Sequence, residues 1–187
     1  MERTLRLLPV LLSLCYCVSA QNEQEMRAMM TYMNPGVMHK VLENAVGVWT
    51  GKGTIWTQPG GSPVSMATET TNEMILGGRY LQGKNSGSFM GMLFEGIGTT
   101  AYDNAKKLFL YTWIDNMGTG MLYLEGTWDD ANKTIYYTGK IVDPVSGKDI
   151  PVREKMVFVD PNTEQMEMYT TVNGQEYKNM EVTYTRK

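Results

Sequence analysis

The chain has 187 residues, a formal net charge of −3 and 42% hydrophobic residues. This length fits one domain, and this hydrophobic content is that of a globular protein rather than a disordered one. The acidic balance argues against nucleic-acid binding, and one histidine with two cysteines leaves few groups for metal or nucleophilic catalysis.

The first 20 residues have the pattern of an export signal. Arg3 and Arg6 precede a short apolar run, and Val18-Ser19-Ala20 supplies a small-residue cleavage site. The apolar run is too short to span a membrane. We therefore expect a signal peptide over 1–20 and an exported mature protein. Both cysteines lie in this leader, so the rest of the chain carries no thiol.

Residues 21–34 form an N-terminal extension in which methionines recur at helical intervals. Four thioethers then share one helical face: Met26, Met29, Met30 and Met33. Thioethers suit Cu(I), which makes copper binding a minor hypothesis here. Methionine is also a flexible apolar filler, and packing is the stronger interpretation of the stripe.

A short amphipathic helix is predicted over 35–46. Asn34 and Pro35 suit its N-cap and first position, and Gly47 is expected to end it. His39 and Glu43 lie one turn apart, but zinc needs three or four protein ligands and the chain has no second histidine. We predict no metal site and interpret this pair as a solvated helix face. Contact of His39 with one end of the domain is the alternative.

From Val48 onward, apolar and polar residues alternate with a period of two between turn clusters such as Asn85-Ser86-Gly87. Ten strands are predicted, over 48–57, 64–75, 79–85, 92–102, 107–115, 119–128, 133–142, 150–159, 164–172 and 175–185. With no helical crossover they form an antiparallel meander, and a sheet this long removes its edges by closing. The expected fold is all-β, a single up-and-down β-barrel domain over 35–187 with a short N-terminal helix.

The last hairpin gives a clue to register. A two-residue turn at 173–174 puts Met166 and Met168 on the opposite face from Met180 and Val182. A three-residue loop, with its glycine in the left-handed region, puts all four on one face. We favour the longer loop, because a one-residue slip exposes half of this apolar set.

The segment Gly47-Val48-Trp49 after a helix resembles the entry to lipocalin-like (calycin) barrels, where a Gly-x-Trp places an indole across the barrel floor. Its continuation to Gly53, Gly-x-Trp-x-Gly-x-Gly, resembles the opening of nitrobindin-type ten-stranded haem barrels. In those barrels a histidine near the C-terminus ligates haem iron. The C-terminal strands here have no histidine, so we predict no haem bound in that way and no other cofactor.

A closer resemblance, over roughly residues 30–187, is to the secreted bacterial family called domain of unknown function 1579. The resembling segments are Pro35-Gly36, His39-Lys40, 74–80, 89–96, 101–107, 113–120 and 183–187. The resemblance implies a calycin-like barrel and a periplasmic or secreted bacterial protein. It brings no established activity.

Polar side chains beside aromatic ones on the strands are the best site candidates. An interior arginine can bind a carboxylate bidentately while aromatic rings bury an apolar body. The predicted ligand-binding residues are Trp49, Arg79, Tyr111, Trp113 and Arg153. The candidate acid–base residues are Glu73, Glu95 and Asp115.

The strand over 107–115 leaves open which set of its side chains points inward. Phe109, Tyr111 and Trp113 share one face with Asp115, whereas the alternate residues on the opposite face, from Leu108 on, are mostly apolar too. Either face can therefore pack into a core.

These observations favour an exported barrel that binds a small, mostly apolar or amphiphilic ligand, with no nucleic-acid partner and no membrane span. Catalysis is less favoured, because no thiol, Gly-x-Ser-x-Gly motif or histidine pair supplies a nucleophile. An acid–base enzyme acting on a barrel-bound substrate is one alternative, and a buried carboxyl with a raised pKa would favour it. A structural or interaction module of the cell envelope is the other, and it requires a filled barrel.

Overall fold

The computed structural model describes residues 8–172 and 174–187, and the chain divides into two compact units between Gly36 and Val37. In the first unit, α1 (Leu8–Met33) is one continuous helix. The methionines of its predicted stripe at 26–33 are each more than half exposed. Within the part of the chain described, no helix is long and apolar enough to cross a membrane.

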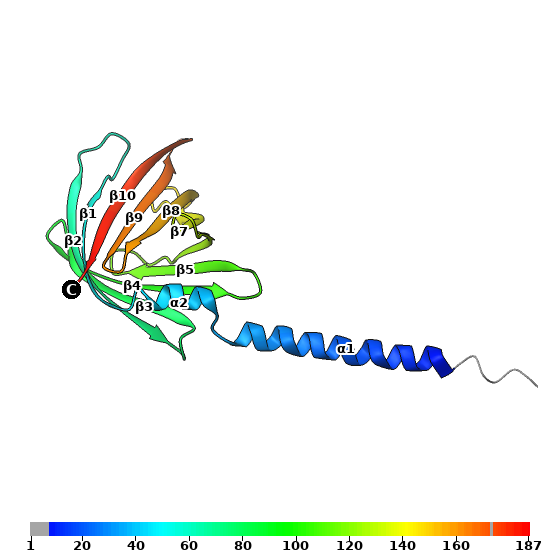
Figure 1. Cartoon of the computed structure of the whole chain (residues 1–187). Helices are drawn as coiled ribbons and strands as arrows, with labels where there is room; N and C mark the ends of the chain where they lie inside the picture. Colours follow the sequence, from blue (N-terminus) through cyan, green and yellow to red (C-terminus); the bar gives the residue numbers. More distant parts are fainter. Residues whose placement is uncertain (1–7, 173) are drawn as a thin grey trace, which may run out of the picture. The chain divides into compact units, whose positions relative to one another are not determined.

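Over the described residues of the second unit, the short helix α2 (Val37–Glu43) is followed by ten antiparallel strands (Figure 1). The strands are β1 (Gly47–Ile55), β2 (Val64–Ile75), β3 (Tyr80–Phe89), β4 (Met92–Asp103), β5 (Leu108–Asp115), β6 (Leu122–Asp129), β7 (Thr134–Val142), β8 (Asp149–Asp160), β9 (Thr163–Val172) and β10 (Gln175–Arg186). Each strand pairs with its neighbours in chain order, and β1 also pairs with β10. The sheet is therefore a closed barrel without edges, and the predicted fold class is confirmed.

β3 is longer than predicted. Residues 85–87, which resemble a turn in sequence, continue the ladder with both neighbouring strands. The chain reverses instead at Met90-Gly91, where both residues have positive φ, 52° and 79°. Two left-handed residues in succession are what a tight two-residue hairpin requires. The sequence hides this turn because methionine is not a usual turn residue.

α2 is shorter than the predicted helix over 35–46, and Gly47 does not cap it. Gly47 is the first residue of β1, with a φ of 134°. A Cβ atom there would lie 2.7 Å from the guanidinium of Arg186 on β10. The glycine is required by this positive φ, which residues with a Cβ atom rarely adopt, rather than by a helix end.

The last hairpin places its apolar set on one face, as predicted, but by a different device. Val172 pairs with Gln175, so β9 and β10 are joined more tightly than the predicted three-residue loop allows. The one-residue shift that brings the apolar side chains to one face comes from a β-bulge at Asn179, where the register between β9 and β10 changes. The bulge sets Met180 opposite Met168 and Val182 opposite Met166.

One end of the barrel is closed. α2 packs there against β2, β3 and β4. Trp49 is 1% exposed and its Nε1–H donates to the carbonyl of Ala45 at 2.9 Å, so the indole lies at the barrel floor as the calycin resemblance implies. Aromatic rings pack edge to face at this end, with 4.9 Å between the ring centroids of Tyr102 and Phe109. The dense core therefore lies at the floor.

Candidate functional site

The barrel lumen contains two cavities above the floor. An inner cavity of about 100 Å³ lies next to Trp49, and an outer cavity of about 280 Å³ lies toward the opposite end. Four polar side chains line both of them: Asn85, Tyr111, Glu154 and Tyr184. These four residues, from β3, β5, β8 and β10, are called the boundary residues below.

The outer cavity has largely apolar walls. Five methionines line it: Met66, Met117, Met166, Met168 and Met180. Phe94 and Trp113 add stacked rings, 6.1 Å apart between centroids. The indole Nε1–H of Trp113 donates to Asp115 at 2.7 Å, so the polar edge of the ring is satisfied within β5. Flexible thioethers and aromatic faces adapt to an apolar molecule of irregular shape.

Two glycines on β4 keep the lumen open. A Cβ atom on Gly96 would overlap the indole of Trp113, and a Cβ atom on Gly98 would lie 3.0 Å from the hydroxyl of Tyr111. The two aromatic side chains of β5 therefore lie against bare backbone of the neighbouring strand. Side chains at these positions would displace both rings into the cavity.

Glu154 is the most unusual of the boundary residues. It is only 5% exposed, and among the described residues no hydrogen bond or ion pair reaches its carboxyl group. Its strand neighbours on the inner face are Tyr137 of β7 and Met168 of β9. Burial raises the pKa of Glu154 to about 7, because the carboxylate loses its hydration and no cation replaces it.

Three tyrosines surround this carboxyl group. Burial raises the pKa of Tyr111, Tyr137 and Tyr184 above the usual value, and the charge of Glu154 adds to each shift. Their hydroxyl groups therefore stay protonated at neutral pH. Each can donate or accept a hydrogen bond in the lumen.

A second buried carboxyl group, Glu164, lies at the inner end of the lumen. Burial raises the pKa of Glu164 to about 7, although the charge of Arg186 acts in the opposite direction. Arg186 covers the outside of the floor, with its guanidinium carbon 4.2 Å from the centroid of the Trp49 ring. It donates to the carbonyls of residues 44, 46 and 161.

The structure brings four of the eight sequence-predicted site residues into the lumen. Trp49 lines the inner cavity, Tyr111 lines both cavities, and Trp113 and Asp115 line the outer one. The question that the sequence left open for β5 is thereby answered, since the face that carries these residues points inward.

The other four, Arg79, Arg153, Glu73 and Glu95, line neither cavity, which corrects their expected positions. Arg79 lies in the turn between β2 and β3 and donates to carbonyls of that turn. Glu73 pairs with Lys84 at 3.6 Å across exposed wall, and Glu95 is exposed. For the three residues that lie on strands, the physical reason is strand parity, because side chains at alternate positions of a barrel strand face solvent.

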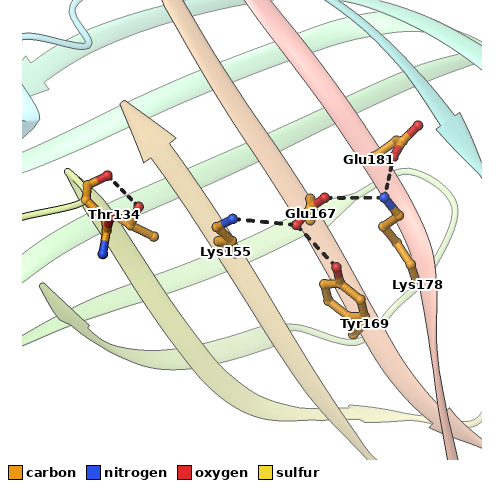
Figure 2. A network of polar contacts seen from close by, with 7 residues as sticks. Thr134, Lys155, Glu167, Tyr169, Lys178 and Glu181 are labelled. Carbon is orange, nitrogen blue, oxygen red and sulfur yellow. Dashed lines mark hydrogen bonds and ion pairs between the residues drawn. The ribbon is translucent and has the colours of Figure 1, made fainter. Parts of the chain in front are cut away.

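Arg153 belongs to a polar network on the outer wall of β8, β9 and β10. Its guanidinium donates to Glu176 at 2.9 and 2.8 Å and stacks over the ring of Tyr169. Beside it, Glu167 bridges Lys155, Lys178 and the hydroxyl of Tyr169 (Figure 2). These contacts hold Arg153 outside the barrel.

His39 is buried rather than on a solvated helix face, which corrects that interpretation. Its ring meets Tyr102 edge-on, with 6.0 Å between centroids, so it covers the floor end of the barrel. Burial and the charge of Arg79 lower the pKa of His39, which keeps the ring neutral at pH 7. Within residues 8–172 and 174–187, no three His, Cys, Asp or Glu side chains are arranged to hold a metal ion.

The sequence interpretation missed Glu154, yet a signal for it exists. The inward residues of β8 read Val152, Glu154, Met156 and Phe158, one acidic group in an otherwise apolar set. A charged residue on the apolar face of a strand predicts a buried polar group.

Comparison with solved structures shows the same fold in distant proteins. Rv2717c from M. tuberculosis is 13% identical with a TM-score of 0.62, over 82% of this chain and 99% of that chain. The S-type phycobiliprotein lyase CPES from Guillardia theta is 9% identical with a TM-score of 0.59, over 80% of this chain and 92% of that one. No curated protein matches the sequence. Residues 34–186 match the model of the family described as protein of unknown function (DUF1579), and the chain belongs to that family.

Proposed function

We propose that this protein is an exported barrel that binds a small, mostly apolar ligand in its lumen. The outer cavity is the observation that carries the proposal. Its volume of about 280 Å³ is close to the lower end of the range for ligand pockets, and its walls are methionine and aromatic side chains with few polar groups. Such walls bind an apolar body through the hydrophobic effect.

Exposed apolar side chains near the same end support this proposal. Met90, Met92 and Leu93, in the hairpin between β3 and β4, are each more than half exposed, as is Met121 before β6. A cluster of apolar residues beside a cavity gives an apolar ligand a favourable path out of water. The envelope-module alternative requires a filled barrel, and the two cavities argue against it.

The test is a fluorescence titration with Nile Red, an uncharged apolar dye. We expect saturable binding of one dye per chain. Met180→Trp, which places a larger side chain in the outer cavity, should weaken binding at least about tenfold, whereas Thr183→Trp on the exposed face of β10 should not. No saturable binding, or equal loss in both variants, would contradict the proposal.

Export rests on the leader pattern of residues 1–20. We expect the protein recovered from the envelope or medium of a bacterial host to begin at Gln21. N-terminal sequencing checks this, and an exported chain that still begins at Met1 would contradict it.

Glu154 favours a second candidate function, acid–base catalysis, since a buried carboxyl group with a pKa near 7 is suited to proton transfer. The probe is 5-nitrobenzisoxazole, from which a base removes the C3 proton as the N–O bond breaks to give a cyanophenolate. A catalytic Glu154 gives a rate that rises with an apparent pKa of about 7 and is abolished in Glu154→Gln. A rate equal to that of buffer would exclude this candidate.

A further inference from the structure

The charged groups of the lumen are all of one sign. Three carboxyl groups line the cavities: Glu164 at the inner end, Glu154 at the boundary and Asp115 in the outer cavity. Among the described residues that line either cavity, none is Lys, Arg or His. The lumen therefore favours a positively charged group and repels an anion.

We propose that the ligand is a cationic amphiphile, an apolar body carrying one protonated amine, and that its ammonium pairs with the Glu154 carboxylate. This inference rests on the proposed function and assigns a chemical class to the ligand of the same site. It reverses the expectation from the sequence, in which an arginine was to bind a ligand carboxylate.

The surroundings of Glu154 fit such a group. An ammonium has three hydrogen-bond donors and no acceptor. Glu154 brings an acceptor that no described residue uses, and Tyr111 and Tyr184 bring hydroxyl oxygens at the same boundary. The apolar body would then occupy the outer cavity, among its methionines and around Trp113.

Because Glu154 is buried without a counter-ion, binding of an amine to it should depend on pH. The titratable groups that face Glu154 are Tyr111, Tyr137 and Tyr184, whose pKa values are raised, so they do not ionise near neutrality. The pKa of Glu154 is about 7, so without ligand the group is about nine-tenths protonated at pH 6 and about one-tenth at pH 8. Pairing with an ammonium lowers this pKa, and binding must release a proton below pH 7.

The experiment compares decylamine, 1-decanol and decanoic acid by isothermal titration calorimetry and by displacement of Nile Red. All three share one tail, and the amine stays charged between pH 6 and pH 8. At pH 8 we expect decylamine to bind at least about tenfold more tightly than 1-decanol, and decanoic acid to bind more weakly than 1-decanol. Affinity for decylamine should rise about tenfold from pH 6 to pH 8, following the ionised fraction of Glu154.

Two variants assign the effect to one carboxyl group. Glu154→Gln should remove the advantage of decylamine over 1-decanol, whereas Glu176→Gln on the outer wall should keep it. If Glu164→Gln removes the advantage of decylamine and Glu154→Gln does not, the assignment to Glu154 is overturned.

Should Glu154→Gln fail to fold, proton release on binding to the unaltered protein tests the proposal. Calorimetry at pH 6 in buffers of different ionisation enthalpy should give about 0.9 proton per decylamine, and release near zero overturns the proposal.

The two levels of proposal fail in different ways. If Nile Red does not bind and calorimetry detects no binding of any of the three decyl compounds, the barrel is not an apolar-ligand binder and both proposals fall. If 1-decanol or decanoic acid binds as tightly as decylamine at pH 8, the binding function stands and the amine inference is overturned.

Discussion

Glu154 is a carboxyl group that folding transfers from water into the lumen with no cation beside it. In the unfolded chain its pKa has the ordinary value of 4.5, and in the fold burial raises the pKa to about 7. The folded state therefore holds the proton more tightly between these two values. Because the unfolded state binds fewer protons in this window, the free energy of unfolding falls as the pH rises from about 4.5 to about 7.

We predict that Glu154→Gln removes this loss of stability. The free energy of unfolding of the variant, relative to the unaltered protein, should increase by about 2–3 kcal/mol between pH 5 and pH 8. Urea unfolding at the two pH values measures the change. If the difference in free energy of unfolding between the variant and the unaltered protein is the same at both pH values, Glu154 has a charged or hydrogen-bonding partner in the folded protein.

Glu176→Gln is the matched control on the outer wall. Hydrogen bonds from Arg153 lower the pKa of the Glu176 carboxyl. Stability gained from a lowered pKa is present above the unfolded value and is lost only as the pH falls below it. The stability difference caused by this variant should therefore stay constant between pH 5 and pH 8.

Among the elements, β10 is joined to the floor by one side chain. Arg186 donates to the carbonyls of Asn44 at 2.6 Å and Pro161 at 2.9 Å and also to that of Val46, while its guanidinium stacks on Trp49. These carbonyls belong to the connection between α2 and β1 and to the turn between β8 and β9. One planar group with several fixed donors thus links β10 to two distant segments.

We predict that Arg186→Met lowers the free energy of unfolding by about 2–4 kcal/mol, because three carbonyl groups lose a charged donor. Arg186→Lys should recover only part of this, since an ammonium cannot reproduce the planar fork. Urea unfolding of both variants measures the loss. Full recovery by lysine would show that charge alone matters at this position.

The contact between β4 and β5 depends on the absence of a side chain at Gly96. We predict that Gly96→Ala displaces the Trp113 indole into the outer cavity, with a loss of about 1–3 kcal/mol in stability and weaker binding of Nile Red. Trp113 fluorescence and dye titration check the two effects. Gly91→Ala serves as the control for an added methyl group, because a Cβ atom there meets nothing within 4 Å, although its φ of 79° carries some backbone strain.

Most of the strand pattern is local and was predictable. Period-two alternation and turn residues locate ten strands, since both signals act within a few residues. The register between paired strands, in contrast, depends on residues outside the turn that joins them. The shift in register that places Met180 opposite Met168 comes from the bulge at Asn179, five residues beyond Gly174, and a single asparagine within a strand pattern does not mark it. The sequence correctly predicted that the four apolar side chains share one face, but it predicted a longer loop where the structure has a β-bulge.

At the scale of the whole molecule, the candidate site was only half predictable. Trp49, Tyr111, Trp113 and Asp115 lie in the lumen, whereas the predicted arginines lie outside. The β5 rings that point inward lie against glycines of the neighbouring strand β4, and this cross-strand contact cannot be read from the alternation within β5 itself. Charge near aromatic residues is a weaker guide to a barrel interior than position within the alternation, which is what identifies Glu154.

The second compact unit contains the whole of the described hydrophobic core. Every buried residue of the core cluster lies between Leu42 and Val152, and the family match begins only at residue 34. We predict that a chain beginning at Asn34 unfolds in urea with the same free energy as the full chain, within about 0.5 kcal/mol, and binds Nile Red equally well, because a closed barrel unfolds as one cooperative unit. A loss greater than about 1 kcal/mol would show that residues before Asn34 contribute to the stability of the barrel.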